Sequence, residues 1–269
     1  MKLNNIELSF DNFASEMAKL KNEKHFDYLV TIIGEDFGEE GLGCIYILEN
    51  TQTNERCSVK TIAKKVDGSD VIPTVINLWK VADLLEREVF DFVGIKFLGH
   101  PDMRRLFLRT DFQGYPLRKD FDMSPDANKF PCTDEPEDDF TMEYSLSEDG
   151  HLVATEKRRF DEDEYVVNIG PNHPSTHGVL RLQTVIDGET VKRIYPHLGY
   201  IHRGIEKMWE SMTYPQTLAL TDRLNYLSAM MHRHALVGVI EEAMGIELSD
   251  RIRYIRTIMD ELQRIDSHL

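Results

Sequence analysis

Residues 25–62 read HFDYLVTIIGEDFGEEGLGCIYILENTQTNERCSVKTI, and this stretch sets the architecture of the N-terminal part. It contains three runs rich in β-branched and aromatic residues, at 25–33, 43–48 and 57–62, a composition typical of β-strands. Gly34 closes the first run, and the polar residues 50–54 form a turn between the other two. The stretch therefore predicts three strands of one sheet.

Helices are predicted on both sides of these strands. Residues 11–22 (DNFASEMAKLKN) show a short amphipathic pattern, and residues 77–92 predict a second helix. The apolar residues near helical spacing in the second helix are Leu78, Val81, Leu84, Leu85 and Val89. Because the order is helix, strands, helix, the expected class is α+β, with an α/β two-layer domain at residues 1–121 and a mostly antiparallel sheet.

Acidic residues dominate the segment 122–164. Between Asp120 and Glu164 there are 16 acidic and 4 basic residues, so this segment carries −12 of the chain's net charge of −16. Such a segment, with three prolines and little apolar periodicity, buries too little surface to offset its ordering entropy. We therefore predict an extended or surface-hugging acidic linker, and the overall charge argues against a nucleic-acid partner, which requires a basic face.

The cysteines and the apolar runs limit the class of protein further. Cys44, Cys57 and Cys132 are far apart and form no C-x-x-C, so we expect no disulfide framework, structural zinc or iron–sulfur cluster held by this chain alone. No apolar run approaches the roughly 20 residues that span a bilayer. The start, MKLNNIELSFDNF, has no apolar signal core, so the chain is expected to stay in the cytoplasm or matrix.

Residues 165–269 predict a β-hairpin that leads into a helical bundle. Strand-like runs occur at 166–170, 178–186 and 190–194, and Asp187-Gly188 is a hairpin turn between the last two. One helix is predicted at 216–244, ended by Gly245, and another begins after Ser249 as N-cap. The last helix carries one apolar stripe: Ile252, Ile255, Ile258, Leu262, Ile265 and Leu269. Because the stripe has no downstream partner, we interpret the bundle as incomplete and the chain as truncated.

The segment EREVFDFVGIKFLGHPDMRR (86–105), followed by DFQGYPLRKDF (111–121), is the most specific motif of the first part. Its residues indicate a helix end, a glycine turn with an exposed His-Pro and a basic pair, without metal-ligand spacing. The run closely resembles the signature of the 30 kDa subunit of respiratory complex I, although Val93 and Tyr115 depart from it. The resemblance implies an assembly role, so His100 and Arg104 are assigned no chemistry.

Three further segments are similar to the opening of the 49 kDa subunit of the same complex. They are GPNHPSTHGVLR (170–181), PHLGYIHRGIEK (196–207) and TDRLNY (221–226). A 30 kDa-like part followed by a 49 kDa-like part is the fused C/D arrangement of some bacteria. The resemblance implies that residues 165–269 are the N-terminal part of a quinone-binding domain.

Four histidines, at 173, 177, 197 and 202, raise the alternative of a metal site. We predict no metal ligand, because His173 and His177 flank Pro174 in a loop and no carboxylate or thiolate companion is evident. Reduction of a quinone needs two electrons and two protons, and an imidazole and a phenol are suitable proton donors for its two oxygens. The resemblance assigns these contacts with the quinone headgroup to His177 and Tyr226.

Two arginines complete the site that the resemblance implies. Arg203 and Arg223 match arginines that lie beside the terminal iron–sulfur cluster of a neighbouring subunit, where a fixed cation raises the cluster potential. Arg223 and Tyr226, three residues apart, are expected on one helix face. Asn225 and Pro215 depart from the family pattern, which often has Asp and Leu there. The aspartate that would orient the His177 imidazole is expected beyond Leu269.

The resemblance as a whole implies a subunit of the peripheral arm of NADH:quinone oxidoreductase, on the cytoplasmic side of the inner membrane. Quinone is the implied substrate, while NAD(H) and the iron–sulfur clusters are bound by partners, especially the cluster-bearing B-type and membrane H-type subunits. One alternative is a subunit of a quinone- or ferredoxin-linked hydrogenase-type complex. A [NiFe]-hydrogenase itself requires paired cysteines after the H-R-G-x-E step, and none follows Cys132. A purely structural assembly subunit is the other alternative.

Overall fold

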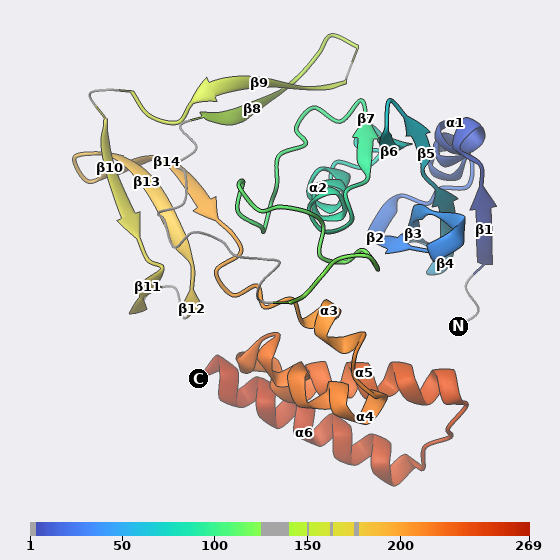
Figure 1. Ribbon diagram of the computed structural model, residues 1–269. Coiled ribbons are helices and arrows are strands. Elements are labelled where there is room, and N and C mark those ends of the chain that lie inside the picture. Colours follow the sequence, from blue (N-terminus) through green and yellow to red (C-terminus); the bar gives the residue numbers. More distant parts are fainter. Residues whose placement is uncertain (1–3, 125–139, 150, 162–163, 175–177) are drawn as a thin grey trace. The chain divides into compact units, whose positions relative to one another are not determined.

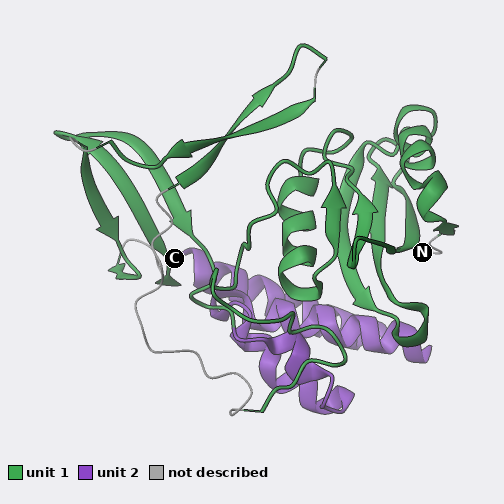
Figure 2. Cartoon of the chain, turned by 45° about the horizontal axis from the view of Figure 1, so that its top comes forward, with its two compact units in different colours: residues 1–202 green, residues 203–269 purple. Residues whose placement is uncertain are grey.

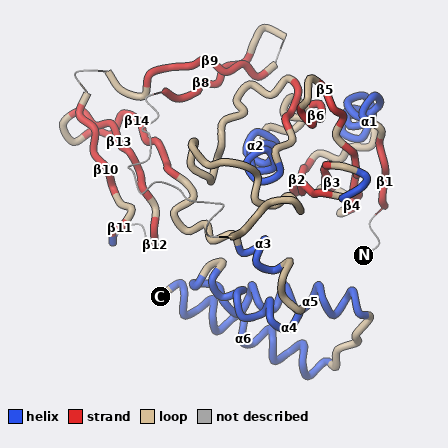
Figure 3. The backbone as a smooth tube through the Cα atoms, viewed as in Figure 1, coloured by secondary structure: helices blue, strands red, loops and turns tan. Residues whose placement is uncertain are grey.

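The computed structural model describes residues 4–124, 140–149, 151–161, 164–174 and 178–269 (Figure 1). The chain divides into two compact units, unit 1 (residues 1–202) and unit 2 (residues 203–269), which are coloured in Figure 2. Sheets with helices come first, then further sheets, then helices, so the mixed α+β class is confirmed (Figure 3). Within the described residues, no helix has the length and apolar character needed to cross a membrane.

The N-terminal part of unit 1 is built on a four-stranded sheet with the order β1-β4-β3-β2. Its elements are β1 (Asn4–Leu8), α1 (Phe10–Asn22), β2 (Tyr28–Asp36), the 3₁₀ turn η1 (Gly38–Glu40), β3 (Leu42–Asn50) and β4 (Glu55–Ile62). The three predicted strands, the helix at 11–22 and the turn at 50–54 are confirmed. The sheet is mostly antiparallel, as predicted, but the unpredicted strand β1 pairs with β4 in parallel.

One face of this sheet carries the core. The alternating side chains of Cys44, Tyr46 and Leu48 on β3 are fully buried. The ring of Phe13 on α1 lies 5.1 Å from that of Tyr46. At Gly34 on β2 a Cβ would lie 2.6 Å from the side chain of Val89, so glycine allows the second helix to approach the sheet closely.

A smaller sheet and the second helix complete this part. The elements are β5 (Lys64–Val66), β6 (Ser69–Pro73), α2 (Ala82–Val93) and β7 (Lys96–Leu98). The predicted start of the helix at residue 77 is wrong, because α2 begins at Ala82. Residues 75–79 instead enter the core as turns, with Val75, Ile76 and Trp79 buried, whereas Val81 and Leu84 are about half exposed. Gly94, with a φ of 82°, ends the helix.

The acidic segment contains regular structure. Residues 125–139 lie outside the described ones, but β8 (Phe140–Leu146) and β9 (Leu152–Arg158) form an antiparallel hairpin. The sequence did not predict this hairpin. The hairpin orders through contacts distant in sequence: the Tyr144 hydroxyl lies 3.2 Å from Asp102 Oδ2, and Leu152 N donates to Asn77 Oδ1 at 3.1 Å.

Unit 1 ends in a three-stranded antiparallel sheet with the order β10-β13-β14. Its strands are β10 (Tyr165–Ile169), β13 (Arg181–Asp187) and β14 (Thr190–His197), and β11 (Asn172–His173) pairs with β12 (Gly178–Val179) in a separate two-stranded sheet. The predicted Asp187-Gly188 hairpin is confirmed, with Asp187 opposite Thr190 and an irregularity in register at Val185/Ile186.

Unit 2 is helical, but the long helix predicted at 216–244 is broken. The elements are α3 (Ile205–Trp209), α4 (Tyr214–Thr217), the 3₁₀ segments η3 (Leu218–Arg223) and η4 (Tyr226–Ser228), α5 (Ala229–Met244) and α6 (Asp250–His268). The break follows from Asn225, whose backbone is extended and whose Oδ1 accepts a hydrogen bond from Leu227 N at 3.1 Å. Gly245 ends α5 and Ser249 precedes α6 as predicted, although the Ser249 side chain makes no capping bond.

Candidate functional site

The predicted quinone residues are only partly described by the structure. His177 lies outside the described residues, and Arg203, Arg223 and Tyr226 belong to unit 2. The predicted common helix face of Arg223 and Tyr226 is wrong, because Arg223 ends η3 and Tyr226 begins η4 after the extended Asn225. Tyr226 is 66% exposed. Arg223 Nη1 donates to Asp222 Oδ1 at 2.9 Å and to the Ala219 carbonyl at 2.6 Å.

The other three histidines of the cluster lie in different surroundings. His173 is exposed on β11. His197 Nε2 lies 3.2 Å from Gln183 Oε1 on the neighbouring strand. The His202 ring stacks on Phe92, with ring centroids 4.9 Å apart. Among the described residues, no group of three potential ligands is arranged to hold a metal ion.

The 30 kDa-like motif builds a buried polar network instead. Glu86 lies on the inner face of α2 and is completely buried. Its carboxylate accepts hydrogen bonds from Thr74 Oγ1 at 2.6 Å and from Val75 N at 2.8 Å. Burial raises the pKa of Glu86 to about 8, against the opposite effect of these two bonds. A titratable group thus fixes the entry of residues 74–75 into the core.

Asp91, which follows Glu86 on α2, also holds a loop through its buried carboxylate. Its Oδ2 accepts the backbone N–H groups of Leu106, Phe107 and Leu108 at 2.7–3.1 Å. Its Oδ1 pairs with Arg105 Nη1 at 2.8 Å, and the Asp91 side chain is completely buried. Three N–H groups and one guanidinium therefore satisfy this buried carboxylate, and together they define the loop after the motif's basic pair.

The structure corrects one expectation about His100. The sequence suggests an exposed His-Pro, but the His100 side chain is fully buried. Its Nδ1 accepts from Asp102 N at 3.0 Å, and its Nε2 lies 3.4 Å from Asp83 Oδ1. Burial lowers the pKa of His100, although Asp83 opposes this shift. Arg104 binds Asp102 through two nitrogens, each at 3.0 Å. Both residues thus have structural partners within unit 1.

Sequence reasoning missed the roles of Glu86, Asp91 and Tyr144. The signal for Glu86 was present, since it replaces an apolar residue on the helical stripe that runs through Ala82, Val89 and Val93. A charged residue on a buried face indicates a specific partner. No local signal links Tyr144 to Asp102, because the two are 42 residues apart.

The fold and this network define an α+β protein whose N-terminal part is fastened by buried carboxyl groups, two of which pair with arginines. Residues 6–127 match the family described as "Respiratory-chain NADH dehydrogenase, 30 Kd subunit". This segment is therefore similar to that family over nearly its whole length up to the acidic segment.

Relatives extend the match to nearly the whole chain, which is a homologue of the fused C/D subunits of NADH-quinone oxidoreductase. It is 54% identical over 264 residues to the C/D subunit of Phocaeicola vulgatus, covering 98% of this chain and 50% of the relative. It is 39% identical over 277 residues to the "C/D 2" subunit of Aquifex aeolicus, covering 98% and 46%. The chain thus spans about half the length of the curated relatives it matches.

A solved structure, "Nqo5 of the trypsin-resistant fragment (1-134) in P63 form", is also similar in sequence. It is 32% identical, and the match covers 36% of this chain and 80% of that one, with a TM-score of 0.34. The superposition is too weak to inform the fold.

Proposed function

We propose that this chain is a quinone-module subunit of a proton-translocating NADH:quinone oxidoreductase. The observation that carries the proposal is the identity of 54% over 264 residues with a C/D subunit of such an enzyme. In this role the N-terminal α+β part docks on other subunits of the peripheral arm. The C-terminal part contributes one wall of the quinone pocket, at the cytoplasmic face of the inner membrane.

The residues proposed to act on the substrate are His177 and Tyr226. A quinone that receives two electrons also takes up two protons, one at each oxygen, and becomes a quinol. An imidazole and a phenol can each donate a hydrogen bond to one oxygen and then be reprotonated from solvent. Tyr226 is 66% exposed, so its side chain is accessible to a molecule outside unit 2, which is compatible with this role.

Electrons are proposed to arrive from NADH through iron–sulfur clusters held by partner subunits. Arg203 and Arg223 would lie beside the last cluster, where positive charge favours its reduced state. Asp222, which pairs with Arg223 at 2.9 Å, would offset part of that charge. The membrane subunits would supply the coupled proton translocation.

The test measures two activities of the complete complex. His177→Ala and Tyr226→Phe are each expected to lower quinone reduction by at least about tenfold, because each removes a proton donor. Oxidation of NADH by an artificial acceptor should stay unchanged, since that reaction does not use the quinone pocket. His151→Ala and Tyr254→Phe, at exposed positions, are the matched controls and should leave both activities intact.

A parallel loss of both activities in the His177 and Tyr226 variants would refute the catalytic assignment. That result would favour the alternative of a structural assembly subunit, for which the buried Asp91 and Glu86 contacts already provide a rigid frame.

A further inference from the structure

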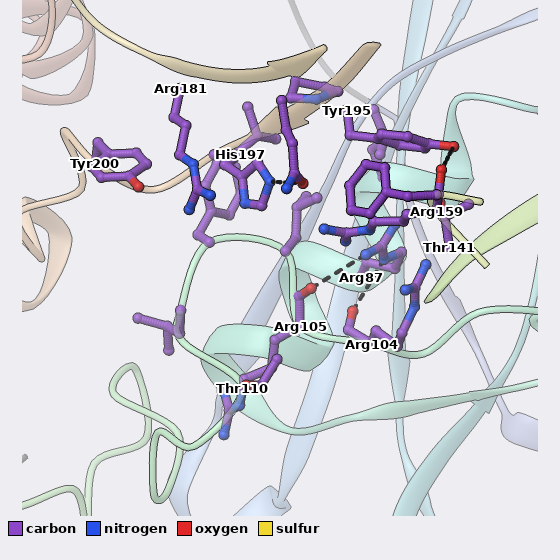
Figure 4. A pocket seen from close by; sticks show the side chains of 18 residues that line it. Arg87, Arg104, Arg105, Thr110, Thr141, Arg159, Arg181, Tyr195, His197 and Tyr200 are labelled. Carbon is purple, nitrogen blue, oxygen red and sulfur yellow. Dashed lines mark hydrogen bonds between the residues drawn. The ribbon is translucent and has the colours of Figure 1, made fainter. Parts of the chain in front are cut away.

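A cavity of about 380 Å³ in unit 1 is lined by five arginines (Figure 4). They are Arg87, Arg104, Arg105, Arg159 and Arg181. The described residues that line it include no aspartate or glutamate. A single sign of charge along a concave surface attracts a ligand of the opposite sign.

The arginines come from distant parts of unit 1. Arg87 is on α2, Arg104 and Arg105 follow the His-Pro turn, Arg159 follows β9 and Arg181 begins β13. Arg87 donates to the carbonyls of Arg104 and Arg105 at 3.1 and 3.2 Å, which are two of the dashed contacts in Figure 4. The motif's own backbone therefore fixes one wall of the cavity.

The segment after β14 forms another wall of the cavity, and two close contacts hold this segment against the loop that includes Phe107. A Cβ at Gly199 would lie 2.2 Å from the Phe107 carbonyl oxygen, so the backbones approach there as only glycine permits. The His202 ring also lies in the stack that Phe92 and Phe107 form. These contacts make the cavity a preformed feature of unit 1, as ligand sites usually are.

The carboxylates that pair with three of the arginines lie behind the wall, since Asp102 Oδ2 also lies 3.6 Å from Arg87 Nη1. Asp102, bound to Arg104, and Asp91, bound to Arg105, have side chains that are 1% and 0% exposed. Arg159 has its guanidinium 5.6 Å from the Tyr195 ring, and Arg181 donates to Asn168 Oδ1 at 3.2 Å. The surface that faces the cavity thus presents guanidinium groups, with apolar side chains such as Phe160 and Leu198 beside them.

We propose that this cavity binds a small organic phosphate. Guanidinium forks match the paired oxygens of a phosphate, and the apolar lining suits the organic part of such a molecule. The volume is that of a small-molecule site. The proposal is independent of the proposed quinone site, because none of that site's described residues (Arg203, Arg223 and Tyr226) lines the cavity.

Calorimetric titration of the full chain with phenyl phosphate at fixed ionic strength tests this site. Phenyl phosphate should saturate one site and bind at least about tenfold more tightly than inorganic phosphate, which lacks the apolar part, or benzoate, which lacks the phosphate. The absence of saturation by phenyl phosphate, or equal or tighter binding of benzoate, would overturn the proposal.

Variants locate the binding. Arg159→Gln combined with Arg181→Gln should weaken phenyl phosphate binding at least about tenfold, because two charge-assisted contacts are lost. Arg159→Lys with Arg181→Lys keeps both charges but removes the forked guanidinium groups. This variant should weaken phenyl phosphate binding less than the glutamine variant does. Arg56→Gln with Arg251→Gln removes the same charge outside the cavity and should leave affinity within about twofold. Equal weakening by this control pair, with native circular dichroism in all variants, would contradict a specific site.

Discussion

At the scale of single residues, the acids of the 30 kDa-like motif are structural parts. Glu86 and Asp91 are both fully buried, and each is satisfied by backbone N–H groups with a hydroxyl or a guanidinium. A buried carboxylate without such partners would be strongly destabilising. Their presence in the motif is therefore explained by the loops that they anchor.

Glu86 makes the stability of unit 1 dependent on pH. Burial raises its pKa from 4.5 to about 8 in the folded protein, so the folded state favours the neutral acid. Its contribution is fully present below pH 4.5 and is lost as pH rises towards about 8, because the unfolded chain releases the proton first. Glu86→Gln should flatten the dependence of the urea midpoint on pH across this window. Identical slopes for the two proteins would contradict this assignment.

At the scale of elements, the structure differs at three places from what the local sequence pattern predicts. The helix expected from residue 77 starts at Ala82, the acidic segment contains the hairpin β8–β9, and the helix expected at 216–244 breaks near Asn225. In the first two cases, contacts with residues far away in sequence hold the backbone. In the third, the short-range bond from Leu227 N to Asn225 Oδ1 competes with the helix.

The loop after β14 offers a test at this scale. Gly199→Ala should destabilise unit 1 by about 2 kcal/mol or more, since it combines a φ of +100° with a Cβ 2.2 Å from the Phe107 carbonyl. Gly188→Ala is the matched control, because its φ of +60° costs backbone energy while nothing lies within 4 Å of the new Cβ. Urea denaturation measures both. An equal loss in the two variants would show that the approach to Phe107 is unimportant.

At the scale of the whole molecule, the two units differ in how much they bury. All the buried apolar side chains among the described residues belong to unit 1, and the buried residues described in unit 2 are Thr217 and Thr221. The predicted stripe on α6 is exposed, with Ile255 at 49% and Ile258 at 56%. Within unit 2, α5 and α6 are joined by polar contacts, such as the bidentate pair of Arg256 with Glu241 at 2.7 Å.

This difference predicts unequal protection of backbone amides in the isolated chain. Helices that bury no apolar side chain open at low cost, so amides of α5 and α6 should exchange at least about tenfold faster than those of β3. The helix α1, which buries Phe13, Met17 and Leu20, is the matched helical control and should exchange slowly. Hydrogen-exchange mass spectrometry measures all of them. Equal protection of α6 and α1 would contradict the prediction.

The sequence by itself determined the features that depend on neighbours along the chain. Strand alternation at 43–48, the Asp187-Gly188 turn, the end of α5 at Gly245 and the α+β class are set by side-chain period and turn chemistry. Tertiary structure alone decided that His100 is buried, that Tyr144 meets Asp102 and that five arginines surround one cavity. These depend on pairs separated by tens of residues, whose contact no local pattern encodes. The pairing of His177 with Tyr226 is of the same long-range kind and stays a prediction.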